Sequence, residues 1–310
     1  MSEFLTVAAI TATVASGIRL SAPFLLAALG ETMGQRSGVL NLGVEGVMLL
    51  GAFSTYYTVL QTGDLWLGVL AGAVAGLIMG LVTAIVSVTL KAEQGISGIG
   101  VYLFGLGVTD LLFQKLVGTP RPISSFPGLK IPLLGDIPLI GKMLFRHNVL
   151  VYAAFALVAV LAFVLNRTTF GTNVKAVGEN PAAADSMGVS VTRTRYATVL
   201  IGNMLAGLAG ATLAIELGIF QQNLTAGQGF IAIALVYFGA WRPGGVLAGS
   251  LLYGMVAATV LSWKTLGIIP RGASDLAAMA PAVITVIALV VVARRFRQPA
   301  ALAKPFVRGS

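Results

Sequence analysis

Four ionisable side chains lie within or near the ends of long apolar stretches of the sequence: Arg19, Glu45, Asp110 and Glu216. A charge at the centre of a lipid bilayer costs roughly 2.5–3.5 kcal/mol on insertion scales, so such groups usually face a cavity or a partner. Arg19 is close enough to an interface to extend its charge into water, and Asp110 and Glu216 approach the ends of their stretches. Exposure to solvent is therefore the simplest interpretation for these three residues.

Glu45 is different, because Asn41 precedes it by four residues. On a helix this spacing places both side chains on one face. Two roles suit such a polar pair: it can line a transport route, or it can form hydrogen bonds that hold neighbouring helices together. The sequence alone leaves both interpretations open.

A second group of residues has the spacing of a short, fully capped helix, in the stretch AVGENPAAADSMGVSV at 176–191. Asn180 is a favoured N-cap, Pro181 suits the first helical position, and Gly188 supplies the left-handed residue that ends a helix. The helix between them has only about two turns, and isolated helices shorter than about 12–15 residues are marginal in water. We therefore expect this helix to pack on a partner.

The apolar residues at the end of this stretch are Met187, Val189 and Val191. We expect them to form an exposed edge that contacts the partner.

The sequence shows no constellation of catalytic or metal-binding residues. It contains one histidine, His147, at the boundary of an apolar stretch, and no cysteine, which excludes disulfides and thiolate metal sites. It also lacks the GxxxxGKS or GxxxxGKT pattern of a phosphate-binding loop. We therefore expect no enzyme activity, metal or cofactor in this chain, and active transport would need a partner or an ion gradient as its energy source.

The composition indicates an all-α polytopic membrane protein with one domain, 1–310. Of the 310 residues 57% are hydrophobic and 10% are charged, whereas a soluble domain has roughly 25% charged residues. Nine apolar stretches are expected to be spans, although 230–241 is short for the roughly 20 residues that a crossing needs. Eight spans with a re-entrant segment there is the alternative. The expected spans are 4–29, 39–60, 65–90, 96–117, 149–165, 197–217, 230–241, 246–262 and 276–293.

The net charge of +9 comes from Lys and Arg in loops and at the end of the chain, where such residues report membrane orientation. This distribution indicates that the basic residues set the orientation of the chain in the membrane and do not bind nucleic acid. The basic tail, 294–310, directly follows a span and is expected in the cytoplasm. An odd number of spans then places the N-terminus and the proline-rich loop 118–148 outside, and the loop 166–194 inside.

Two short glycine-bounded segments are similar to each other: GVEGVMLLGAF at 43–53 and GFIAIALVYFGAW at 229–241. Their expected directions across the membrane are opposite, as in inverted repeats, and such pairs point to a transport pathway. A chance match between apolar segments is the alternative. The candidate pathway residues are Asn41, Gly43, Glu45, Gly227, Gly229 and Phe230.

Three segments in collinear order resemble the permease subunits of bacterial ABC importers for branched-chain amino acids, simple sugars and nucleosides. They are LAALGETMGQRSGVLNLGVEGVMLLGAF, GENPAAADSMGVSV and LTAGQGFIAIALVYFGAWRPGGVLAGSLLYG. The sub-pattern QRSGVLNLGVEG is most similar to the nucleoside branch. That branch commonly has a glutamate at the position where this chain has Gln35.

The resemblance implies the type II ABC importer fold with inverted repeats, in a bacterial inner membrane, and a pathway for purine or pyrimidine nucleosides. It implies three partners: a double-domain cytoplasmic ATPase that binds ATP and Mg, a second paralogous permease, and an extracytoplasmic substrate-binding lipoprotein. It also implies that the capped helix couples the permease to the ATPase. The coupling residues would be Gly178, Glu179, Asn180, Pro181, Asp185, Met187 and Gly188.

Three alternatives remain. The substrate could be a simple sugar or a branched-chain amino acid. The chain could instead be a proton-coupled secondary transporter, with Glu45, Asp110 and Glu216 as a relay. A passive channel or a scaffold is the third.

Overall fold

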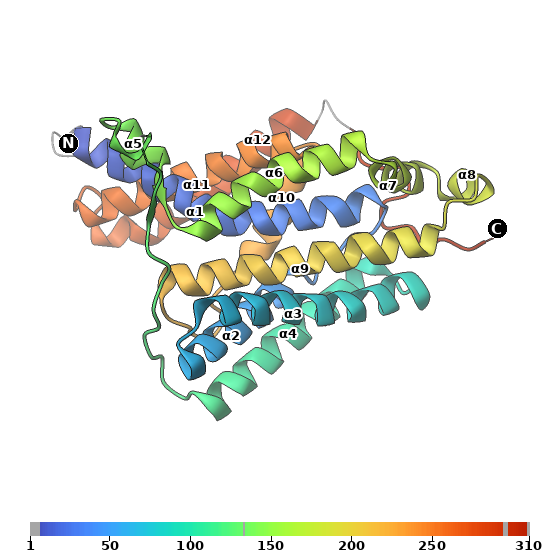
Figure 1. The fold of residues 1–310 in the computed structure, drawn as a ribbon, viewed down its shortest axis with the longest axis horizontal. Coiled ribbons are helices and arrows are strands. Elements are labelled where there is room, and N and C mark those ends of the chain that lie inside the picture. The colour runs from blue at the N-terminus through green and yellow to red at the C-terminus, as the bar shows by residue number, and fades with distance from the viewer. Residues whose placement is uncertain (1–6, 133, 294–296, 309–310) are drawn as a thin grey trace.

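Long helices that lie side by side make up almost all of the structure, a computed structural model that describes residues 7–132, 134–293 and 297–308 (Figure 1). Phe4 in the first expected span, and Arg294 and Arg295 in the tail, lie outside the described residues. The elements in chain order are α1 Val7–Arg36, α2 Val44–Thr62, α3 Leu65–Ala84 with a π-helical continuation Ile85–Thr89, α4 Gln94–Leu116, β1 Leu129–Lys130, a 3-10 turn Leu134–Asp136, α5 Ile140–Leu144, β2 Arg146–His147, α6 Val149–Arg167, α7 Thr169–Glu179, α8 Pro181–Ser186, α9 Val191–Leu217, α10 Gln228–Phe238, α11 Pro243–Thr265, a 3-10 turn Arg271–Ala273 and α12 Ser274–Ala293.

Six of the described helices are long and apolar enough to cross a membrane, namely α1, α3, α4, α6, α9 and α11. The three other expected spans coincide with α2, α10 and α12. α10 has 11 residues, which is about 17 Å of helix and little more than half of a roughly 30 Å hydrocarbon core. Helices thus occupy all nine expected places, while the count of nine full crossings remains a prediction.

The central helix of the bundle is α9, which packs against α1, α2 and α3. Glycines allow these helices to approach one another closely. A Cβ atom added at Gly76 of α3 would collide with the backbone oxygen of Asn203 on α9. A Cβ atom at Gly51 of α2 would likewise collide with the backbone of Gly207. This is the small-residue packing typical of membrane helices, and it holds the polar residues of α9 close to the candidate pathway.

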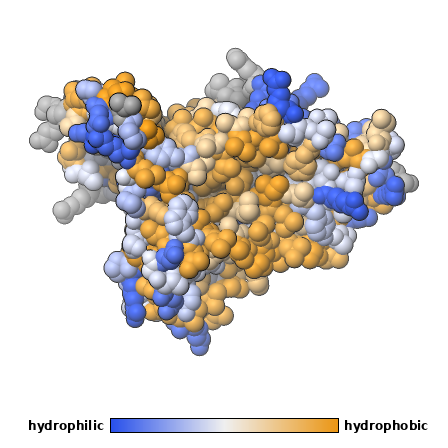
Figure 2. Space-filling model, in the orientation of Figure 1, coloured by the Kyte–Doolittle hydropathy of each residue, from blue (hydrophilic) through white to orange (hydrophobic). Residues whose placement is uncertain are grey.

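The surface seen in Figure 2 is hydrophobic over most of its middle, and hydrophilic residues gather toward the ends of the long helices. Large apolar side chains such as Leu103, Phe104 and Phe163 are more than half exposed. The long axis of the molecule is therefore the direction in which its helices would cross a membrane.

The two loops singled out in the sequence lie at opposite ends of this long axis (Figure 1). α5, from the loop 118–148, lies beside the beginning of α1, whereas α7, α8 and the end of the chain lie together at the other end. The first loop is mostly irregular, with one two-residue ribbon that pairs Leu129 with His147.

Reporter fusions test which compartment each end faces. A phosphatase fused after Asp136 is expected to be active, because it is exported, and a fluorescent protein fused after Asp185 is expected to fluoresce in the cytoplasm. The reciprocal fusions serve as controls and should be silent. The same compartment at both positions would refute the orientation.

Candidate functional site

The carboxylate of Glu45 binds the N-terminus of α10. Glu45 is fully buried, and its oxygens accept hydrogen bonds from the Thr225 hydroxyl (2.6 Å) and from the backbone N–H groups of Gly227 (2.7 Å) and Gly229 (2.5 Å). The first N–H groups of a helix lack partners within the helix, and its dipole favours a negative charge there. Glu45 therefore caps α10 from a different helix.

Glycine is required where α10 approaches Glu45. A Cβ atom at Gly229 would lie 2.6 Å from the Cα atom of Glu45, and Gly227, the N-cap of α10, has a φ of +89°. Two of the predicted pathway glycines thus allow the carboxylate and the helix end to meet.

The two similar segments of the sequence meet at this junction and run in opposite directions from it. α2 leads toward the loop 118–148, where the Tyr56 hydroxyl donates to the backbone oxygen of Arg121 (2.9 Å). α10 leads toward the other end, where the Trp241 indole donates to Oε1 of Gln35 (2.7 Å). Opposite directions are what an inverted repeat requires, and the repeat itself remains a prediction.

The expectation that Asn41 and Glu45 share a helical face is wrong, because α2 begins only at Val44. The side-chain oxygen of Asn41 accepts from the N–H of Gly43 (2.9 Å), which bends the chain before the helix, and its amide donates to Oδ1 of Asn203 on α9 (3.0 Å). Apart from the local bond between Asn41 and Gly43, the contacts described for Asn41 and Glu45 hold neighbouring segments together. A direct contact with a substrate remains a prediction.

Sequence reasoning missed a buried polar cluster at the end of α1, because the first span was expected to end at Leu29 and instead continues to Arg36. Glu31 accepts from the amide of Gln35 (3.0 Å) and from the N–H of Asn41 (3.0 Å). Gln35 accepts in turn from Trp241, so its amide donates and accepts at once, which an ionised carboxylate at this position would not do. The i, i+4 spacing of Glu31 and Gln35 was the signal in the sequence.

The predicted pathway residue Phe230 lies at the surface, 40% exposed. Its ring meets that of Tyr102 on α4 edge to face, with 5.4 Å between the centroids. Nearby along α10, the buried Oε1 atom of Gln228 has no hydrogen-bond partner within the structure. α4 and α10 thus present an aromatic pair at the surface, whereas the amide oxygen of Gln228 is buried.

The capping predicted for the short helix is confirmed. α8 runs from Pro181 to Ser186, the side-chain oxygen of Asn180 accepts from the N–H of Ala183 (3.0 Å), and Gly188 has a φ of +85°.

The expected apolar edge is wrong in part. Met187 is 84% exposed, but Val189 is half-buried and Val191 is buried against Val177 and Ala184. Val191 begins α9 and faces inward, so the chain itself supplies much of the surface on which α8 packs. Of the three residues, Met187 is the one left for a partner.

The other predicted coupling residues have distinct positions. Gly178 is buried, and a Cβ atom there would collide with the backbone oxygen of Arg36 at the end of α1. Glu179 is exposed, and Asp185 forms an ion pair with Arg308 (2.9 Å). Gly178 therefore fixes the distance between α7 and α1.

Residues 301–304, which we call the C-terminal strap, lie between the coupling segment and the turn after α1. The N–H of Ala301 donates to the backbone oxygen of Gly178 (2.9 Å), and that of Ala303 donates to Gly38 (3.1 Å). Arg195, itself 1% exposed, donates to the backbone oxygen of Lys304 (3.0 Å). The sequence indicated only a basic tail here, and nothing in it indicated this docking.

At the opposite end, Glu216 pairs with Arg19 (3.5 Å) and accepts a hydrogen bond from Asn148, beside a cavity of about 530 Å³. The side chain of Glu216 is only 15% exposed, so the expectation of a solvated carboxylate is wrong. The side chain of Arg19 is 52% exposed. His147 lines the same cavity, and Nε2 of its ring is 2.8 Å from the backbone oxygen of Met143. Burial lowers the pKa of His147, which keeps the ring neutral near pH 7.

The three carboxylates of the proton-relay alternative share no hydrogen-bond or ion-pair partner among the described residues. Glu45 is bound by Thr225 and backbone groups, Glu216 by Arg19 and Asn148. A buried oxygen of Asp110 has no hydrogen-bond partner among the described residues. Within the described residues, no group of three His, Cys, Asp or Glu side chains is arranged to hold a metal ion.

Comparison with known proteins identifies the family. Residues 13–293 match the family described as the branched-chain amino acid transport system / permease component. The guanosine ABC transporter permease NupQ of Bacillus subtilis is 34% identical over 93% of this chain and 94% of its own. The nucleoside ABC transporter permease NupC of Lactococcus lactis is 35% identical over 89% and 90%.

A relative from Haloferax volcanii whose name assigns it to glucose transport, the ABC transporter permease TsgC13, is 38% identical over 81% of this chain and 77% of its own. No solved structure matches. The resemblance inferred from the three sequence segments is confirmed, and so is the absence of an enzyme role, since these relatives are permease subunits. The chain therefore belongs to the branched-chain amino acid transport system permease family, and it is a multi-pass membrane permease subunit of an ABC transporter.

Proposed function

We propose that the chain forms half of the translocation pathway of an ABC importer for nucleosides. The observation that carries this proposal is the similarity to a guanosine permease and a nucleoside permease over nearly the full length of each chain. A separate ATPase binds ATP and Mg and drives transport, and this chain supplies no cofactor.

The pathway passes the surface that Phe230 and Tyr102 form on α10 and α4. A nucleobase stacks on aromatic rings, and such stacking contributes about 1–3 kcal/mol per base. Glu45 acts behind this surface, where it fixes the N-terminus of α10.

The coupling segment α7–α8 docks on the ATPase through the exposed side chain of Met187. A second, paralogous permease completes the pathway, because the aromatic pair on this chain lies at its surface and needs a facing wall. An extracytoplasmic binding lipoprotein delivers the substrate at the end that carries the loop 118–148. The membrane is the inner membrane of a bacterium, with the N-terminus outside and the tail in the cytoplasm.

Glucose or another simple sugar is the second candidate substrate, because the relative TsgC13 carries a glucose name at 38% identity. Sugars also pack on aromatic faces, so the surface at Phe230 suits both classes.

Uptake by the assembled transporter distinguishes these substrates. In proteoliposomes that contain both permeases, the ATPase and the binding protein, we expect ATP-dependent uptake of labelled guanosine or adenosine that exceeds uptake of glucose and leucine. Phe230→Ala should lower nucleoside uptake about tenfold, in line with the loss of one stacked base. Phe163→Ala, which removes a 62%-exposed ring from α6, is the matched control and should leave uptake unchanged.

Preferred uptake of glucose would support the second candidate. Uptake that persists without ATP but stops with a proton ionophore would refute the ABC mechanism.

A further inference from the structure

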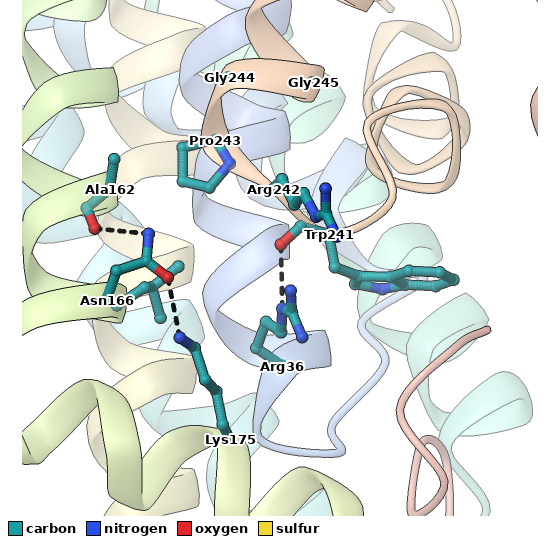
Figure 3. A pocket seen from close by; sticks show the side chains of 10 residues that line it. Arg36, Ala162, Asn166, Lys175, Trp241, Arg242, Pro243, Gly244 and Gly245 are labelled. Atoms are coloured by element: carbon teal, nitrogen blue, oxygen red, sulfur yellow. Dashed lines mark hydrogen bonds between the residues drawn. The ribbon is translucent and has the colours of Figure 1, made fainter. Parts of the chain in front are cut away.

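A cavity of about 600 Å³ lies at the end of the bundle that carries α7 (Figure 3). The ends of α1 and α6, the side of α7 and the beginning of α11 enclose it. Three cationic side chains line it, namely Arg36, Lys175 and Arg242. No carboxylate is among the described residues that line it, so the cavity carries an excess of positive charge.

Two of these cations, Lys175 and Arg36, form hydrogen bonds with neutral groups. Nζ of Lys175 donates to the side-chain oxygen of Asn166 (2.8 Å), and Nε of Arg36 donates to the backbone oxygen of Trp241 (2.9 Å), so both bonds go to neutral acceptors (Figure 3). Glu179 is the carboxylate that acts on Arg36. Burial, together with the nearby charge of Arg36, lowers the pKa of Lys175, so an anion in the cavity would relieve the repulsion between these groups.

The beginning of α11 adds to this positive potential. Its N-cap is Arg242, which makes no side-chain capping bond, and Pro243, Gly244 and Gly245 follow with little side-chain bulk. A helix N-terminus presents backbone N–H groups and the positive end of the helix dipole to an anion.

The position of the cavity along α6 matches the depth of lipid headgroups. Val160 and Phe163 on α6 are 51% and 62% exposed, as lipid-facing residues are. Asn166, which lines the cavity, lies one turn after Phe163, and the helix ends at Arg167. The cavity therefore lies where the apolar surface of this helix gives way to polar residues.

We propose that this cavity binds the phosphate group of an anionic phospholipid from the leaflet on the side of α7. Basic pockets between membrane helices bind such headgroups, and a phosphodiester offers charged acceptor oxygens to cations that line such a pocket. The bound lipid would tether α6 and α7 to the α10–α11 turn, and so would brace the base of the coupling segment. Inorganic phosphate shares the chemistry of the headgroup, and the experiment separates the two.

The test measures lipid binding by the purified chain in nanodiscs of phosphatidylcholine. Added phosphatidylglycerol is expected to be retained in native mass spectra and to raise the melting temperature, whereas added phosphatidylcholine and inorganic phosphate have neither effect. Lys175→Gln should weaken phosphatidylglycerol binding about fivefold, the effect of one cation near a membrane surface. Lys175→Arg keeps the charge and should bind like the unchanged protein.

Arg167→Gln is the matched control, because it removes a cation from the end of α6 that does not line the cavity. It should leave binding unchanged. Equal retention of the two lipids would overturn the proposal. A Lys175→Gln variant that binds phosphatidylglycerol as well as the unchanged protein would also overturn it. So would an Arg167→Gln variant that binds as weakly as Lys175→Gln. Competition by inorganic phosphate at the concentration of the lipid would assign the cavity to a soluble anion instead.

Discussion

Substitution of Glu45 by glutamine is expected to destabilise the protein strongly and to abolish uptake. The three donors at the start of α10 need two acceptor oxygens, and glutamine offers one oxygen and a competing NH₂ group. Each buried donor left without a partner costs about 1–3 kcal/mol, a large part of a typical stability of about 5–15 kcal/mol. Thermal unfolding of the purified variant and its yield in membranes measure this effect.

Thr225→Val is the matched control, because it removes one of the three donors and leaves the carboxylate in place. Its loss of stability should be smaller than that of Glu45→Gln, and uptake should persist. The opposite pattern would be informative: a Glu45→Gln variant of normal stability that no longer transports would indicate that the carboxylate acts on the substrate or on a proton.

Met187→Asp is expected to leave the isolated permease as stable as the unchanged chain and to abolish uptake by the assembled transporter. The side chain is 84% exposed, so a charge there costs the free permease little, whereas the same charge buried against the ATPase is penalised unless it is paired. Melting of the permease, and substrate-stimulated ATP hydrolysis and uptake by the same proteoliposomes, measure the two expectations.

Gly188→Val tests the same end of the helix through its backbone instead of an exposed side chain. Gly188 has a φ of +85°, where a β-branched residue is an outlier, so α8 should lose its end and the transporter its coupling. Gly188→Asn is the control, since asparagine tolerates this region, and it should retain coupling. Normal coupling in both the Met187→Asp and the Gly188→Val variants would reduce α8 to a linker.

The features that could be predicted from the sequence are those decided by neighbouring residues. The caps of α8 are of this kind, because Asn180, Pro181 and Gly188 each act within one turn of the helix. Apolar length likewise located all nine helices, since the signal lies within each stretch.

The features that were missed depend on contacts that helical periodicity and apolar length do not contain, some of them with residues far away in the sequence. Glu31 and Gln35 lie beyond residue 29, where the first span was expected to end. Their burial follows from contacts with Asn41 and with Trp241, which is more than 200 residues away. Val191 read as exposed for the same reason, since its burial depends on α7 and α8 folding back over the start of α9. The local pattern also placed Asn41 on a helix. Its side chain instead accepts a hydrogen bond from Gly43, and the helix begins only after that glycine.

The C-terminal strap sets an order on biosynthesis. Translation makes Gly38 early and residues 301–304 only after α12, so these partners are separated by nearly the whole chain. A nascent permease whose helices have all entered the membrane still lacks the hydrogen bonds from Ala301 to Gly178 and from Ala303 to Gly38. The contacts of the strap are therefore the last to form, and a chain that stops before residue 301 leaves α7 and the turn after α1 without these two hydrogen bonds.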